Sequence, residues 1–249
     1  MSYSESEHYL VFDIETSPLP WESFSESQQE YLLRGAATDE EKDKKRAEMA
    51  LTPLTSQVVC IGLQLMERRG ENKFDTIRRK AMAVDKDIKD ESRIETLTTG
   101  DECKLESEKD VLKDFWEIFD KEKYRNVHLI SFNGRNFDAP YLMLRSALLS
   151  VKPSRNLMAG TKFNYTLHTD LLDELTFYSP GAYGATKRFN FDFYTRQFGI
   201  KSPKSEGVDG SKVAEYFNSG RILDIAEYCL RDVTATWELF LKWREYLRG

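Results

Sequence analysis

The stretch Tyr9-Leu10-Val11-Phe12-Asp13-Ile14-Glu15 places two acidic side chains at the end of an apolar run. Residues 9–14 read as a buried strand. Because side chains alternate between the two faces of a strand, Asp13 and Glu15 point to one side and Ile14 to the other. Two like charges on one face repel, and a cation between them would remove that repulsion. The alternative is that the strand ends here and both carboxylates are solvated.

The spacing of apolar residues predicts the other elements. Further strands are expected at 57–66, 73–83, 93–98 and 127–132. Helices are expected at 106–119, 138–149, 191–198, 211–218 and 222–247. The polar stretch 22–50 reads as an exposed helical insertion, and the Gly-containing segment 179–187 as a loop. Strands interleaved with helices indicate an α/β fold, a central mixed sheet flanked by helices.

Composition narrows the class of protein. The 249 residues, 40% of them hydrophobic and 31% charged, fit one globular domain over residues 1–249. No apolar run approaches the roughly 20 residues of a membrane span. The three cysteines, Cys60, Cys103 and Cys229, are too widely spaced for a disulfide framework or a zinc site, so we expect a reducing cytoplasm. A net charge of −6 argues against a protein that grips duplex nucleic acid electrostatically.

A third carboxylate, Asp138, follows the strand expected at 127–132 and the loop 133–136. An Asp at the start of a helix most often accepts hydrogen bonds from backbone N–H groups as an N-cap. The C-terminal ends of strands in open α/β sheets are also where ligands bind. Both readings of Asp138 remain open on its position alone.

Tyr228 and Asp232 stand four positions apart in the last expected helix, one turn apart on the same face. Taken alone, the tyrosine reads as a core residue and the aspartate as a surface residue. The combination changes this interpretation: Asp-x-Glu in the first strand, an Asp after a later strand and Tyr-x-x-x-Asp in a late helix occur in this order.

These segments resemble the DEDD exonuclease superfamily, within it the tyrosine-containing branch, and the stand-alone predicted 3′-5′ exonucleases similar to the proofreading domain of family B DNA polymerases. The matching segments are VFDIET (11–16), SFNGRNFD (131–138) and YCLRDV (228–233). The resemblance spans roughly residues 9–245, but no motif covers 22–50 or 85–105. In the related branch a catalytic histidine stands five residues before the last Asp, where this chain has Glu227.

The resemblance implies an RNase H-like fold and a metal-dependent 3′-5′ exonuclease. It implies that Asp13, Glu15, Asp138 and Asp232 hold two divalent cations, for which oxygen ligands favour Mg²⁺ or Mn²⁺. It also implies that Tyr228 orients the attacking water.

Thr16, Asn133 and Phe137 are the expected substrate contacts, although Asn133 can instead tie down its loop and Phe137 can be a core residue. Tyr183 is a weaker candidate for stacking on the terminal base. Asp170 and Asp173 lie outside the motifs and are expected to be structural.

The expected substrate is the 3′ end of nucleic acid, single-stranded DNA more than RNA. An exoribonuclease and a non-catalytic nucleic-acid-binding scaffold are the alternatives. A polymerase or repair partner is compatible with the sequence but not readable from it.

Overall fold

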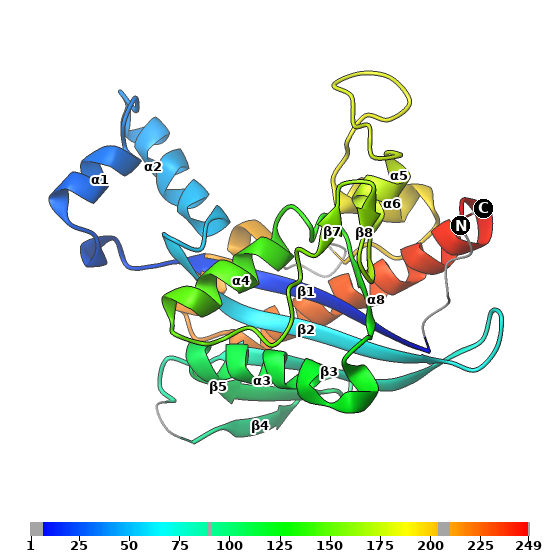
Figure 1. The fold of residues 1–249 in the computed structure, drawn as a ribbon. Coiled ribbons are helices and arrows are strands. Elements are labelled where there is room, and N and C mark those ends of the chain that lie inside the picture. Colours follow the sequence, from blue (N-terminus) through cyan, green and yellow to red (C-terminus); the bar gives the residue numbers. More distant parts are fainter. Residues whose placement is uncertain (1–6, 89–90, 204–209, 249) are drawn as a thin grey trace.

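A seven-stranded mixed sheet forms the centre of the computed structural model, which describes residues 7–88, 91–203 and 210–248 (Figure 1). Its strand order is β4-β5-β3-β2-β1-β6-β9. The strands are β1 (His8–Pro18), β2 (Ser56–Arg68), β3 (Phe74–Val84), β4 (Arg93–Thr96), β5 (Glu102–Glu106), β6 (His128–Ser131) and β9 (His168–Asp170). The strands β1, β2 and β3 pair antiparallel, whereas β6 is parallel to both β1 and β9, and β5 is parallel to β3.

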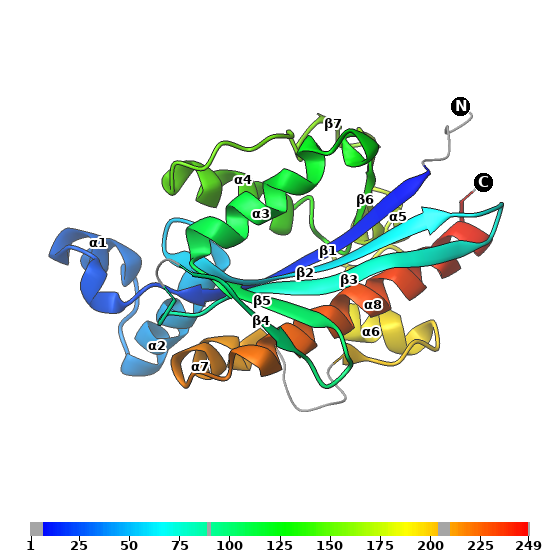
Figure 2. The same ribbon diagram turned by 90° about the horizontal axis from the view of Figure 1, so that it is seen from below.

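Helices cover both faces of the sheet. Figure 2 shows α3 (Glu108–Asp120) and α4 (Asp138–Leu148) on one face and the long α8 (Ile222–Tyr246) along the other. The remaining helices are α5 (Leu171–Leu175), α6 (Phe191–Gln197) and α7 (Val213–Asn218). None of the helices in the described ranges has the length and apolar character needed to cross a membrane. This α/β architecture is the one expected from the sequence.

The alternation of β1 side chains divides the core. Phe12 packs against Phe115 of α3, whereas Tyr9 packs against Trp237 and Phe240 of α8. Odd-numbered residues of this part of β1 therefore face α8, so Asp13 lies on the α8 side of the sheet.

The stretch 22–50 contains the expected helices. They are α1 (Glu26–Leu32) and α2 (Asp39–Glu48), preceded by the 3₁₀ turn Trp21–Ser23 and followed by Met49–Leu51. Both begin with a capping box, from Ser25 and from Thr38, and neither buries a residue. The pair projects from the end of the sheet where β1 ends (Figure 1).

Two strands of the sheet differ from the expectation. Residues 102–106 form β5, so α3 begins at Glu108, two residues after the predicted start. The strand β9 consists of His168, Thr169 and Asp170, all buried and all polar. The run of β9 lacks the apolar pattern by which a strand is recognised in a sequence, whereas residues 102–106 (ECKLE) alternate polar and apolar side chains over only five positions. A short hairpin, β7 (Gly160–Thr161) and β8 (Asn164–Tyr165), also lies where no strand was predicted.

Candidate catalytic site

Three separate elements bring the four candidate carboxylates together. Asp13 and Glu15 come from β1, Asp138 is the first residue of α4, and Asp232 lies in α8. The Asp138 Oδ1 atom accepts a hydrogen bond of 3.0 Å from the Ile14 N–H, which fixes α4 to the strand between Asp13 and Glu15. Asp138 is therefore not the N-cap of α4, a position held by Phe137; one of its oxygens instead accepts a hydrogen bond from the neighbouring strand.

Gly62 sets how closely α8 approaches the sheet. It is the β2 partner of Asp13, and a Cβ atom at this position would lie 2.8 Å from the Cys229 Sγ atom and 3.2 Å from the Cys229 carbonyl carbon. Only a residue without a side chain fits so close to a helix backbone. The glycine thereby brings Tyr228 and Asp232 within reach of Asp13.

Burial and mutual repulsion raise the pKa values of these carboxyl groups. Burial raises the pKa of Asp13 well above its usual range, and the charges of Asp138, Asp232 and Glu15 raise it further. The pKa of Glu15 is raised by burial and then by Asp232. Burial raises the pKa of Asp138 to about 7, although N–H donors, including that of Ile14, oppose the shift. Clustered buried carboxylates are what divalent cations neutralise, so the residues present fit a metal site.

Tyr228 donates a hydrogen bond from its hydroxyl to Asp232. Its ring is buried, with 6% of its surface exposed. Burial and the charges of Asp232, Glu15 and Asp13 raise the pKa of the hydroxyl, so Tyr228 keeps its proton near neutral pH. Its hydroxyl can therefore orient a neighbour but cannot act as a base.

Cys229 is part of the cluster, although no role was predicted for it there. Ligand atoms of Asp13, Glu15 and Cys229 lie within 4.8 Å of one another. Burial raises the pKa of the Cys229 thiol well above its usual range, and the sulfur lies 3.5 Å from the Asp13 carbonyl oxygen. We therefore assign Cys229 as a neutral thiol that donates to Asp13, and leave metal binding to the carboxylates.

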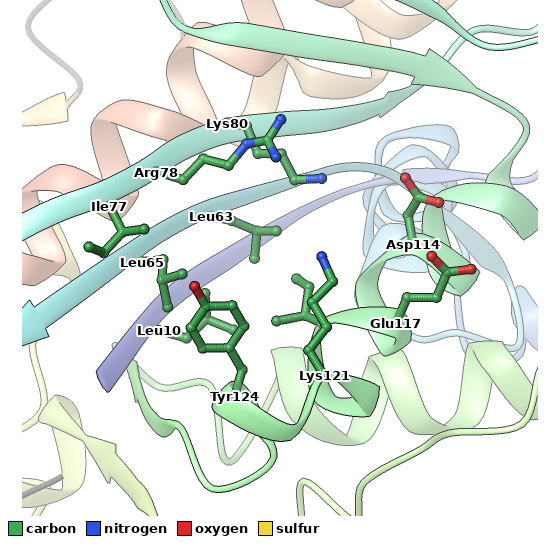
Figure 3. A pocket seen from close by; sticks show the side chains of 11 residues that line it. Leu10, Leu63, Leu65, Ile77, Arg78, Lys80, Asp114, Glu117, Lys121 and Tyr124 are labelled. Carbon is green, nitrogen blue, oxygen red and sulfur yellow. The ribbon is translucent and has the colours of Figure 1, made fainter. Parts of the chain in front are cut away.

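A pocket of about 130 Å³ opens on this cluster. It is lined by Asp13, Phe132, Phe191, Asp192, Pro203, Tyr228, Asp232 and Thr236. A larger pocket of about 320 Å³ lies against Leu10, which faces the α3 side of the sheet (Figure 3). That pocket is lined by leucines, by the cations of Arg78, Lys80 and Lys121, and by the carboxylates of Asp114 and Glu117; none of the four candidate carboxylates lines it.

The loop that carries Asp138 is held by Asp170. The N–H groups of Asn133 and Arg135 donate to the two oxygens of the Asp170 carboxylate at 2.9 and 2.8 Å. Asn133 adopts a left-handed φ of 63°, and a Cβ at Gly134 would lie 2.3 Å from the Ser131 Oγ atom. The structural role expected for Asp170 therefore includes positioning Asp138.

The other sequence-predicted residues lie around this site without joining the cluster. Thr16 donates its hydroxyl to the Ala50 carbonyl at 2.8 Å, and Phe137 packs against Tyr141 with ring centroids 5.5 Å apart. Asp173 accepts a hydrogen bond of 2.7 Å from the Tyr165 hydroxyl. Glu227 accepts hydrogen bonds from the N–H and hydroxyl of Thr98, so it ties α8 to the turn after β4. Substrate contacts by Thr16, Asn133 and Phe137 stay predictions.

Asp138 makes the stability of the metal-free protein depend on pH. Because its pKa rises from 3.8 to about 7 on folding, the folded chain holds this proton more tightly than the unfolded chain. Its contribution to stability is present below pH 4 and is lost as the pH rises to about 7, and each kcal/mol lost lowers the melting temperature by about 2–4 °C.

The measurement is a series of thermal melts in EDTA from pH 4 to 8. Asp138→Asn keeps an oxygen for the Ile14 N–H but cannot titrate. As the pH rises, the melting temperature of the wild type should therefore fall relative to that of the variant. A constant difference would show that Asp138 does not titrate in this range.

A family model described as "Predicted 3'-5' exonuclease related to the exonuclease domain of PolB" matches residues 75–249. The chain belongs to this family. The match includes Asp138, Tyr228 and Asp232 and begins after Asp13 and Glu15. A search of the curated proteins found no match.

Solved structures show the fold of this exonuclease family member. Among 79 similar chains is the family B DNA polymerase from the hyperthermophilic archaeon Pyrobaculum calidifontis, with a TM-score of 0.55 and 21% sequence identity. The likeness covers 98% of this chain but only 25% of the polymerase. The seven-stranded sheet and its helices are thus the RNase H-like exonuclease fold expected from the sequence.

Proposed function

We propose that this site hydrolyses the phosphodiester bond at the 3′ end of a nucleic acid with the help of two divalent cations, Mg²⁺ or Mn²⁺. The observation that carries the proposal is the gathering of four carboxylates from β1, α4 and α8, two of which, Asp13 and Asp232, line a pocket, with raised pKa values at Asp13, Glu15 and Asp138. Membership of a predicted 3′-5′ exonuclease family supports the same reaction.

Asp13, Glu15, Asp138 and Asp232 would hold the cations, which would supply an activated water and charge stabilisation for the leaving 3′ oxygen. Asp13 interacts with all three other carboxylates, so we assign the shared ligand position to it. Asp138 is restrained by the Ile14 N–H, which leaves its second oxygen for a ligand. Each role follows from the side chain's own neighbours.

Tyr228 would orient the attacking water. Its hydroxyl proton is engaged by Asp232, so the lone pairs of its oxygen remain to accept a hydrogen bond from water. Tyr228 does not accept the proton that the attacking water releases. Its raised pKa keeps the hydroxyl neutral, and a neutral hydroxyl is not a base, so this proton has to leave by another route.

The proposed substrate is single-stranded DNA, and an exoribonuclease is the second candidate. The relation of the family to the exonuclease domain of PolB favours DNA. A non-catalytic scaffold is disfavoured because all four carboxylates are present. Digestion of matched 5′-labelled DNA and RNA strands, single-stranded and duplex, separates these candidates, because the 2′-hydroxyl distinguishes the two sugars.

Cleavage should require Mg²⁺ or Mn²⁺ and stop in EDTA. Ca²⁺ should bind without supporting turnover, because it prefers longer and looser coordination. Mn²⁺ and Ca²⁺ should both raise the melting temperature, since binding to the folded chain relieves the repulsion among buried carboxylates. Cleavage that persists in EDTA would contradict the metal-dependent mechanism.

A polymerase or repair partner, a cytoplasmic location and a single domain over residues 1–249 stay predictions. Co-purification from cells under reducing conditions, followed by identification of bound proteins, tests the first of them.

A further inference from the structure

Exposed aromatic side chains concentrate in one part of the chain. In the described ranges, two exposed aromatic residues, Tyr31 and Tyr246, stand apart from the rest. The others are Phe163, Phe177, Tyr183, Phe189 and Phe193, with exposed fractions of 70%, 65%, 90%, 39% and 45%. We call these five side chains the aromatic shelf. A group of apolar rings left in contact with water marks a surface that binds something.

The charges around the aromatic shelf are basic. Between residues 160 and 193 the exposed charged side chains are Lys162, Lys187 and Arg188. The acidic side chains in the same stretch, Asp170, Asp173, Glu174 and Asp192, are buried or half-buried and accept hydrogen bonds. In a chain of net charge −6, this surface is therefore suited to an anion that also offers flat apolar faces.

Cations and rings are interleaved on the shelf. The Lys187 Nζ atom lies 5.1 Å from the centroid of the Phe189 ring, and the Lys162 Nζ atom lies 5.7 Å from that of Phe163. A basic groove with aromatic faces is how proteins bind single-stranded nucleic acid without reading its sequence, because every base has a face on which a ring can stack.

The shelf adjoins the catalytic pocket. Phe191, at the start of α6, lines the pocket with Asp13 and Tyr228. Phe189 and Phe193, two residues to either side, stack on each other outside it, with ring centroids 4.3 Å apart and an interplanar angle of 14°. The stacked pair therefore flanks, on both sides in the sequence, a residue that lines the pocket.

Polar contacts connect this pair to the part of the shelf that carries Phe163. Asp173 accepts the Tyr165 hydroxyl at 2.7 Å and lies 3.6 Å from Arg188, which connects the segment before Phe189 to the hairpin of Phe163. In Figures 1 and 2, α5 and α6 both lie far from α1 and α2, which project at the opposite end of the molecule.

We propose that the aromatic shelf binds the single strand that leads to the catalytic pocket, with bases stacked on Phe189 and Phe193 and phosphates beside Lys187 and Arg188. This inference rests on the proposed function, which already names a single-stranded substrate, and adds the surface that holds the strand. The internal bases of a duplex are paired and stacked on both faces, and only the terminal pair has a free face, so the shelf favours a single strand over a duplex.

The test is the binding of 5′-labelled 12-nucleotide DNA and RNA strands, measured by fluorescence anisotropy in EDTA so that no strand is cut. The double variant Phe189→Ala/Phe193→Ala should weaken binding about tenfold or more, since stacking on one ring contributes roughly that factor per base. Phe193→Tyr should bind as wild type. Tyr31→Ala is a matched control, because Tyr31 is 67% exposed and also stacks with a cation, Arg34, but lies on α1.

The basic side chains give a second readout. Each phosphate contact contributes about 0.7 to the slope of log K against log salt for a single strand, so Lys187→Gln/Arg188→Gln should reduce that slope by more than one unit. A change that only loosened the loop would not alter the slope in this way.

Two outcomes would contradict the proposal that the shelf binds the strand. They are equal binding by wild type and the double phenylalanine variant, and equal affinity for single strand and duplex. Hydrolysis of the p-nitrophenyl ester of thymidine 5′-monophosphate with Mn²⁺ keeps this test separate from the proposed function, because a single nucleotide does not reach the shelf. No ester hydrolysis with strand binding intact would contradict the proposed function alone. Ester hydrolysis with strand binding insensitive to the phenylalanines would contradict the shelf alone.

Discussion

Asp13→Asn should reduce cleavage to background and, at the same time, make the metal-free protein more stable. The variant removes a charge that burial and three neighbouring carboxylates all disfavour, and the amide has nearly the same shape. Relief of that repulsion should raise the melting temperature in EDTA near neutral pH. The same change removes the ligand that interacts with every other carboxylate, so Mn²⁺ should no longer stabilise the variant as it does the wild type.

These opposite effects on rate and stability distinguish a metal ligand from a structural aspartate. Asp120→Asn, at the exposed end of α3, is the control for removing one negative charge and should change neither quantity. Wild-type cleavage by Asp13→Asn would end the two-metal assignment.

Tyr228→Phe should lower the turnover rate by roughly 10²–10⁴-fold, the range for one positioned catalytic group. The buried ring stays in place, and only the hydroxyl that donates to Asp232 is lost. Mn²⁺ affinity should change little, because the carboxylates remain, and the lost hydrogen bond should cost about 1 kcal/mol of stability. Single-turnover cleavage and a metal titration measure the two effects separately.

Two further variants frame this result. Asp232→Asn should reduce both metal affinity and rate, since it removes a ligand. Tyr141→Phe also deletes a buried tyrosine hydroxyl, one that pairs with the Ser56 hydroxyl at 2.6 Å, and should cost about 1 kcal/mol of stability without slowing cleavage. A wild-type rate in Tyr228→Phe would make the tyrosine a packing residue.

The parts of the fold that follow from the sequence are those with strong apolar periodicity. β1, β2, α3 and α8 bury continuous apolar faces, so their pattern is visible in the chain itself. β9 is invisible by this means because its buried residues are polar and satisfied by tertiary contacts, such as the 2.8 Å hydrogen bond between His168 and Ser131. It belongs to the sheet through its parallel pairing with β6.

The candidate site divides in the same way. Asp13, Glu15, Asp138, Tyr228 and Asp232 could be named from motifs, because spacing along a strand or helix fixes which side chains share a face. Asp170, Cys229 and Gly62 could not, because each acts across a long sequence separation on a residue from another motif. Their contributions depend on contacts that local pattern does not record.

The glycine at position 62 makes the spacing between β2 and α8 a condition for assembling the candidate site. A methyl group there would push α8 outward and carry Tyr228 and Asp232 away from Asp13, with every acidic side chain still present. Whether the site can form therefore depends on the distance between α8 and the sheet as well as on which ligand residues are present. A complete set of carboxylates in the sequence does not by itself guarantee that they meet.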